Sequence, residues 1–111
     1  MGASKKQFFP PNQNAIATLC NALGHPARVA IIEHLLINKV CICEDMLSIL
    51  PLTRPTIWQH LQKLERAQLI QGNFKNNSLV YEIDSINLNN VDAYFSHWKI
   101  EKQKKLLARN H

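Results

Sequence analysis

The chain has 111 residues, enough for one domain, and its 46% hydrophobic and 19% charged residues are typical of a globular protein. Its net charge of +5 suits a polyanionic partner, but charge alone does not separate DNA from RNA or an acidic membrane surface. No apolar run is long enough to cross a membrane and none follows the first residues as in a secretory signal, so we expect a cytoplasmic protein with no membrane partner.

The N-terminal residues divide into an arm and the start of a helix. Residues 1–11 are polar and end in two prolines, which indicates a flexible arm ahead of a single domain spanning 12–109. Apolar residues then recur at helical spacing, and we expect Asn12 or Asn14 to cap this helix and Gly24 to end it.

The middle of the chain alternates between helices and one short extended piece. A second helix is predicted over residues 26–38, a short strand over 40–42 and a brief helix over 43–50. A turn follows, and then a helix over residues 53–67 with Thr53 as its N-cap. These two consecutive helices form a helix-turn-helix.

The hydrophobic period then changes. Residues 69–74 and 79–83 are typical of strands joined by the polar turn 75–78, and two strands alone are marginal in water, so the hairpin must pack on the helices. A last helix over residues 88–108 carries an apolar stripe at spacings of three and four. That stripe, formed by Leu88, Val91, Phe95 and Trp98, is too long for so small a core to cover, which favours a second copy as its cover.

This order of elements defines the expected fold. It is mainly α with a small β-hairpin, and a helix-turn-helix followed by a two-stranded wing is the winged helix-turn-helix arrangement.

The helix over residues 53–67 is the predicted recognition helix, because its inward face is apolar and its outward face is polar. Arg54 can hydrogen-bond both acceptors of a guanine, Gln59 can pair with an adenine edge, and Thr56 can contact a phosphate or a thymine methyl. His60 lies nearer the core side, where a structural role is the alternative. The predicted DNA-binding residues on helix and wing are Thr53, Arg54, Pro55, Thr56, Gln59, His60, Lys63, Lys75, Asn76 and Asn77.

Several segments in this order resemble the ArsR/SmtB metalloregulatory repressors. The segments that carry the resemblance are Leu23–Ile32, Cys41–Met46, Thr53–Leu64, Ala67–Ile70 and Val80-Tyr81. The resemblance implies a homodimer built from the first and last helices, which binds a near-palindromic operator as a sequence-specific repressor and is released by a chemical signal. It leaves the operator sequence and the inducer open.

The cysteines are the candidates for receiving that signal. Cys41 and Cys43 can enter one coordination sphere, and Cd(II), Zn(II) and As(III) favour thiolate ligands. A nearby helix N-terminus is expected to lower their pKa values. Met46 stands where arsenic-responsive relatives commonly have a third cysteine. Cys20 could supply the third thiol across the dimer, or it could be a buried small hydrophobe, since it shares the apolar face of the first helix.

Other readings remain open. The alternative regulator has the same fold and no metal site, and it responds to redox state, through a disulfide between Cys41 and Cys43, or to no ligand. A second metal site of the family would use the last helix, where Asp92, His97 and Glu101 are present but the family's Asp-x-His pair is missing. A winged-helix module that binds protein or RNA is a further rival.

The sequence offers little support for an enzyme. It contains no glycine-rich phosphate loop, no Gly-x-Ser-x-Gly motif and no paired carboxylates in an evident pocket. We therefore expect a binding protein.

Overall fold

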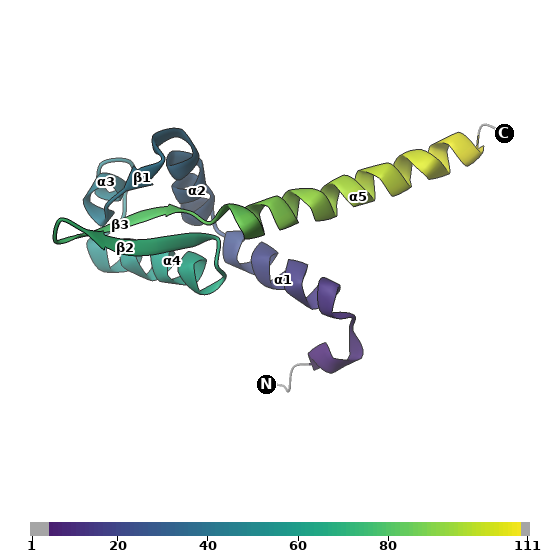
Figure 1. Cartoon of the computed structure of the whole chain (residues 1–111), viewed down its shortest axis with the longest axis horizontal. Coiled ribbons are helices and arrows are strands. Elements are labelled where there is room, and N and C mark those ends of the chain that lie inside the picture. Colours follow the sequence, from purple (N-terminus) through teal and green to yellow (C-terminus); the bar gives the residue numbers. More distant parts are fainter. Residues whose placement is uncertain (1–4, 110–111) are drawn as a thin grey trace.

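A computed structural model describes residues 5–109 and contains five α-helices, a 3-10 helix and a three-stranded sheet (Figure 1). The elements in chain order are η1 (Lys5–Phe8), α1 (Pro11–Leu23), α2 (Pro26–Asn38), β1 (Val40–Cys41), α3 (Cys43–Leu47), α4 (Arg54–Arg66), β2 (Ile70–Lys75), β3 (Ser78–Ile83) and α5 (Ser85–Arg109). This is the predicted winged helix-turn-helix, mainly helical with a small sheet.

The N-terminal segment differs from the expectation. Residues 1–4 of the expected arm lie outside the described residues, and the 3-10 helix η1 follows them. The capping prediction is wrong, because Pro10 holds the N-cap position of α1. The Asn14 side chain instead donates to the carbonyl oxygens of Lys6 and Phe9, at 2.9 and 3.4 Å, and so ties η1 to the helix. α1 ends before Gly24, as predicted.

The core lies between the helix-turn-helix and the sheet. α4 packs against β2 and α2 against β3, so each strand of the hairpin has a helix behind it. Ile57, Leu61 and Leu64 are completely buried, which confirms the predicted inward face of α4 and leaves the opposite face of the helix outside. The largest fully buried side chains are those of Tyr81, Ile31, Leu35, Met46, Ile57, Leu61, Leu64, Leu69 and Ile70.

The wing is part of a three-stranded antiparallel sheet in the order β1-β3-β2, one strand more than the predicted hairpin. β1 joins through the pairs of Val40 with Glu82 and Cys41 with Tyr81. In β2 a Cβ at Gly72 would lie 3.0 Å from a ring carbon of Tyr81, so a larger residue at this close approach would push the Tyr81 ring aside by a few tenths of an ångström. The Gly72 N–H donates to the Glu65 carboxylate at 3.1 Å, which fastens the sheet to α4.

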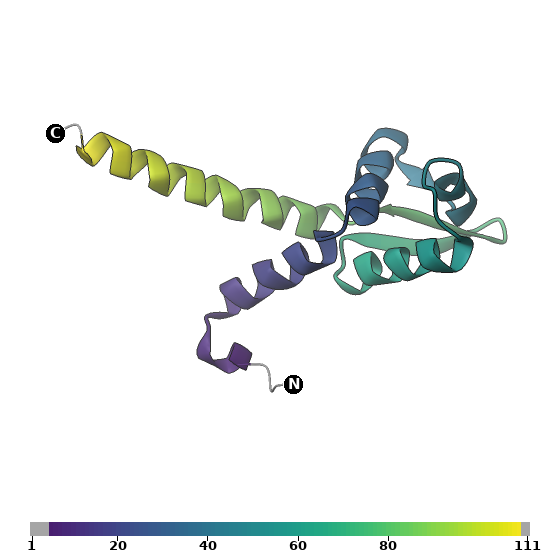
Figure 2. The same ribbon diagram turned by 180° about the vertical axis from the view of Figure 1, so that it is seen from behind.

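Two helices differ in length from the prediction. α3 ends at Leu47 rather than at residue 50, while α5 begins at Ser85, three residues before the predicted start. α5 leaves the body near the C-terminal end of α1, and the two helices then diverge (Figures 1 and 2). None of the residues of α5 is buried.

Within residues 5–109, no single helix combines the length and apolar character needed to cross a membrane. α1 and α2 reach that length and composition only as a pair, across a bend of 92°.

Candidate nucleic-acid interface

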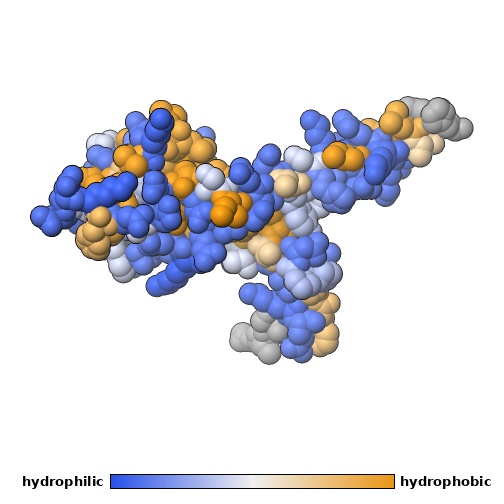
Figure 3. All heavy atoms as spheres, in the orientation of Figure 1, coloured by the Kyte–Doolittle hydropathy of each residue, from blue (hydrophilic) through white to orange (hydrophobic). Residues whose placement is uncertain are grey.

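The outward face of α4 and the tip of the wing lie at the same end of the molecule (Figure 1). Arg54, Pro55, Gln59 and Lys63 are exposed, and Thr56 is half-buried. The wing turn that joins β2 and β3 is exposed as well, including Lys75, Asn76 and Asn77. Hydrophilic side chains cover the tip of this end, with hydrophobic side chains exposed beside them (Figure 3). The fold thus brings the predicted helix and wing residues to one end.

The first turn of α4 carries a feature that the sequence did not show. The Arg54 guanidinium forms a bidentate ion pair with the carboxylate of Glu44 on α3, with Nη2 2.9 Å from Oε2. The hydrogen bond from Arg54 lowers the pKa of Glu44, and the same bond raises the pKa of Arg54. Arg54 is therefore held at the surface by an acid, and it must exchange this carboxylate for any base or phosphate that it contacts.

Thr53 occupies the N-cap position of α4 but does not make the expected bond to a backbone N–H. Its hydroxyl lies 3.0 Å from the hydroxyl of Thr56. The two hydroxyls therefore hydrogen-bond to each other at the start of the recognition helix.

His60 faces α2 rather than the outside. Its ring centroid lies 4.5 Å from that of His25, and Nη1 of Arg28 is 3.5 Å from its Nδ1. Burial lowers the pKa of His60, and the positive charges of His25, Arg28 and Lys63 lower it further. These contacts link the start of α2 to α4. They are consistent with a structural role for His60, which was the alternative to a DNA contact. A DNA contact by His60 stays a prediction.

The thiols of the Cys-x-Cys pair have pKa values shifted opposite to the expectation. Burial raises the pKa of Cys41 to about 12, helped by the negative charges of Asp45 and Cys43. Burial also raises the pKa of Cys43, although Arg54 opposes this. The expectation of a lowered pKa was wrong because burial disfavours both thiolates, and the carboxylates of Asp45 and Glu44 in the first turn of α3 add negative charge beside them.

The third thiol is not near this pair. Cys20 is exposed on α1, so its reading as a buried hydrophobe is wrong for the single protomer. Asp92, His97 and Glu101 are exposed along α5. Within residues 5–109, no three side chains of histidine, cysteine, aspartate or glutamate come close enough together to hold a metal ion. One protomer brings together only the two thiols.

The aromatic side chains of Trp58 and Phe74 were missing from the predicted interface. Trp58 on α4 is 50% exposed, and Phe74 in the wing strand β2 is 78% exposed. Both lie beside residues of the predicted DNA-binding set. The resemblance places Trp58 on the DNA side, where the family usually has a small polar residue, but the predicted set left it out. Phe74 gave no signal, because an aromatic residue in a strand is normally assigned to the core.

No family model matches the sequence, and no curated protein matches it. Solved structures do resemble the fold. An ArsR-like transcriptional regulator from Rhodococcus sp. RHA1 superposes with a TM-score of 0.76 at 20% identity over 89% of this chain and 92% of that one.

Two further solved structures have a similar fold. The transcriptional repressor PagR of Bacillus anthracis gives a TM-score of 0.60 at 25% identity, over 70% of this chain and 91% of its own. A homodimeric winged helix-turn-helix DNA-binding domain from Mycobacterium bovis, described as a possible ArsR-family regulator, gives 0.64 at 18% identity over 99% and 96%. The chain therefore has the winged helix-turn-helix fold of the ArsR-like transcriptional regulators.

Proposed function

We propose that this protein is a sequence-specific DNA-binding transcriptional regulator of the ArsR/SmtB type that acts as a repressor. The observation that carries the proposal is the division of α4 into a fully buried apolar face and an outward polar face beside the wing tip. α4 then enters the major groove, where Arg54 and Gln59 contact base edges, and the wing turn meets the backbone. The sequence resemblance and the shared fold both support this function.

The regulator acts as a homodimer through α1 and α5. An open apolar hollow of about 430 Å³ lies between these helices, and Ile16, Leu19 and Tyr94 are among its lining residues. α5 buries none of its residues within the protomer, and its large apolar side chains Phe95 and Trp98 are exposed. A partner's α1 and α5 would cover these surfaces.

Cys41 and Cys43 are the candidate residues for binding a metal inducer. Cys41 and Cys43 can offer two thiolates to Cd(II), Zn(II) or As(III), but the protomer adds no third ligand among residues 5–109. Their raised pKa values also oppose thiolate formation. The described residues of one protomer bring together two thiols, so a three-thiolate site would need a further ligand from the partner, for which Cys20 on the exposed surface of α1 is the candidate. Because the raised pKa values oppose thiolate formation, we favour the alternative regulator, which works without a bound metal.

The primary test measures fluorescence anisotropy of reduced protein titrated into labelled DNA from upstream of its own gene and into a scrambled duplex. We expect the upstream DNA to bind more tightly. Arg54→Ala is expected to weaken specific binding by roughly five- to a hundredfold, as for loss of a bidentate base contact. Arg109→Ala removes the same charge at the far end of α5 and is the control. Equal affinity for both duplexes would refute sequence-specific regulation through this DNA.

Glu44 provides a second variant in the same assay. Glu44→Gln releases Arg54 and removes a negative charge near the DNA, so affinity should rise by up to about fivefold. The control is Glu101→Gln, which breaks the comparable surface pair with Lys104 on α5. Unchanged or weaker binding by Glu44→Gln would show that the ion pair does not compete with DNA.

The same titration tests the thiols. If metal acts through them, Cd(II), Zn(II) or As(III) releases DNA from the unaltered protein but not from Cys41→Ser/Cys43→Ser. The regulator without a metal site, which we favour, binds DNA equally in all these conditions.

A further inference from the structure

A basic groove lies between the N-terminal segment and the last turns of α4. It has a volume of about 330 Å³ and is lined by Lys6 from η1, Thr18 and Asn21 from α1, and Lys63 and Arg66 from α4. Among residues 5–109, no acidic side chain lines it. Three elements thus place three cations and two small polar side chains around one open hollow.

The cations of α4 in this groove are not neutralised. Neither Lys63 nor Arg66 forms an ion pair with a carboxylate among residues 5–109. The one acid of α4, Glu65, accepts a hydrogen bond from Gly72 on the sheet side of the helix. The helix therefore directs its acid to the wing, while two of its cations line the groove.

The groove is continuous with the predicted reading face. Lys63 follows Gln59 by about one turn of α4, and Arg66 follows Lys63 by about one more. η1 curves back below α1 on the side of the molecule where α4 lies (Figure 1). A duplex whose major groove holds the N-terminal half of α4 would therefore have a neighbouring strand of phosphates near Lys6 and Arg66.

We propose that this groove binds the sugar-phosphate backbone of the DNA, so that η1 and the C-terminal end of α4 form a second contact beside the recognition contact. This rests on the proposed DNA-binding function. Lysine and arginine contacts to phosphates position a protein on the duplex without reading its sequence. The groove accordingly supplies affinity and orientation, while Arg54 and Gln59 supply specificity.

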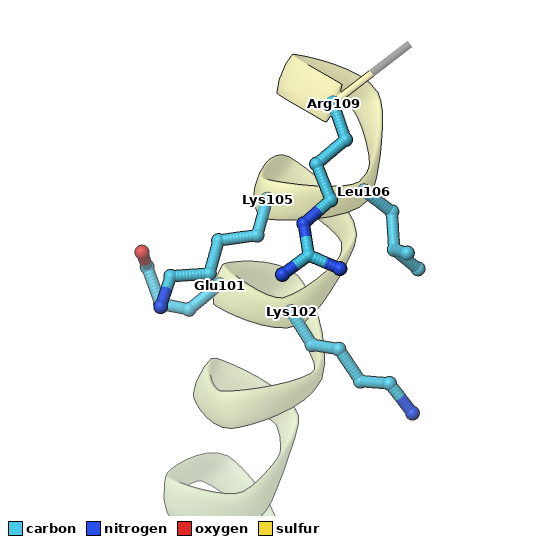
Figure 4. Close-up of a pocket in the computed structure, with 5 residues that line it drawn as sticks. All are labelled: Glu101, Lys102, Lys105, Leu106 and Arg109. Atoms are coloured by element: carbon cyan, nitrogen blue, oxygen red, sulfur yellow. The ribbon is translucent and has the colours of Figure 1, made fainter.

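The basic end of α5 is a weaker candidate for the same role. Its hollow is lined by residues of a single helix, including Lys102, Lys105 and Arg109, and it also contains the carboxylate of Glu101 (Figure 4). That carboxylate lies 3.4 Å from Nζ of Lys104. Because no second element shapes this surface, its lysines serve as the matched control.

The test is the salt dependence of DNA binding. Lys6→Gln/Arg66→Gln and the control Lys102→Gln/Lys105→Gln each remove two positive charges. We measure the dissociation constant against KCl concentration for each protein on the preferred duplex. The logarithm of the association constant falls linearly with the logarithm of the salt concentration, and each lost phosphate contact should make this negative slope shallower by about 0.9. The groove variant should therefore lose roughly 2 from its slope per bound protomer, whereas the control stays near the unaltered value.

Further variants separate charge from folding. Lys6 is exposed and lies outside the core, so the single variant Lys6→Gln should leave α4 unaffected. It should make the salt slope shallower by about 0.9 per protomer. Arg66→Lys keeps the charge and should keep the slope. The preference for the specific over the scrambled duplex should stay constant in all groove variants.

The outcomes distinguish the two proposals. If the unaltered protein does not discriminate between duplexes, the proposed function fails. If it discriminates but the groove variants keep the slope of the control, the groove does not bind phosphate and the proposed function stands. A slope restored by Arg66→Lys together with a slope lowered by Lys6→Gln supports the groove contact.

Discussion

Cys41 carries a thiol that the fold keeps protonated. Its side chain is only 4% exposed, in the strand position opposite Tyr81, and Asp45 places a negative charge nearby. The pKa of this thiol therefore rises to about 12. A soft metal ion would have to displace this proton, so metal binding at the pair should strengthen steeply with increasing pH.

The raised pKa of Cys41 predicts a loss of stability in alkali. The thiol ionises near pH 9.0 when unfolded but near 12 when folded, so its contribution is complete below pH 9.0 and is lost between these values. The loss should approach on the order of 1 kcal/mol per pH unit in that window. Urea unfolding at pH 8, 9, 10 and 10.5 measures it.

Matched variants identify the responsible group. Cys41→Ala should flatten the decline of the free energy of unfolding with pH, while Cys20→Ala, at an exposed thiol, should keep the decline of the unaltered protein. If the free energy of unfolding falls equally with pH in the unaltered protein, Cys41→Ala and Cys20→Ala, the Cys41 thiol does not ionise as stated.

At the residue scale, the sequence predicted which side chains of a helix are buried better than it predicted which side chains contact one another. Ile57, Leu61 and Leu64 faced inward as predicted, because a helical period fixes which side chains share a face. The pairing of Arg54 with Glu44 was not predictable, since the two residues are ten positions apart on different helices. Only the angle between α3 and α4 brings them together.

At the scale of elements, the wing turn depends on two asparagines. Asn76 and Asn77 have φ values of 51° and 67°, the left-handed pair that lets a two-residue turn match the twist of β2 and β3. A β-branched residue at such a φ is strained, so Asn77→Val should cost about 1–2 kcal/mol of stability. Asn77→Gly should be neutral or stabilising.

Urea denaturation of these variants checks the turn. Asn73→Val is the control, because residue 73 is exposed within β2, where a β-branched side chain is favourable. An equal loss for the two valine variants would mean that the strain at residue 77 is not the cause.

The ends of the elements were the least predictable. α2 and α4 end next to Lys39 and Gln68, which adopt φ values of 64° and 61° although neither is a glycine or an asparagine. α1 starts at Pro11 with Pro10 as its N-cap, and the Asn14 side chain bonds back to the preceding 3-10 helix. Such ends are set by tertiary contacts, whereas helical periodicity specifies only the interior of a helix.

At the scale of the whole molecule, the most prominent feature is a long helix whose first turns pack on the core and whose remaining length is exposed. α5 has 25 residues, and the molecule measures 61 Å along its longest axis. On α5 the rings of Tyr94, Phe95 and Trp98 pack edge to face, with centroids 5.0 to 6.5 Å apart. Leu88 and Val91 of the predicted stripe pack, partly buried, against the core of the protomer, whereas Phe95 and Trp98 stay exposed. The exposed half of the stripe is why a second copy is the expected partner.

Sedimentation of the purified protein tests this assembly. We expect a species of twice the 12.7 kDa protomer mass at micromolar concentration. Trp98→Glu should raise the dimer dissociation constant by roughly thirtyfold or more, as for loss of an aromatic anchor at an interface. Trp58→Glu is the control, since Trp58 is 50% exposed and Trp98 is 56% exposed, but Trp58 lies on α4.

DNA binding then connects the dimer to the proposed function. A symmetric dimer presents two copies of α4 to two half-sites, so weakening the dimer should reduce affinity for a two-half-site operator much more than affinity for a single half-site. Trp98→Glu should therefore lose the advantage of the full operator while remaining folded, because no residue of α5 belongs to the buried core. If the unaltered protein sediments as a monomer, or if Trp98→Glu remains as dimeric as Trp58→Glu, the exposed stripe of α5 is not the dimer contact.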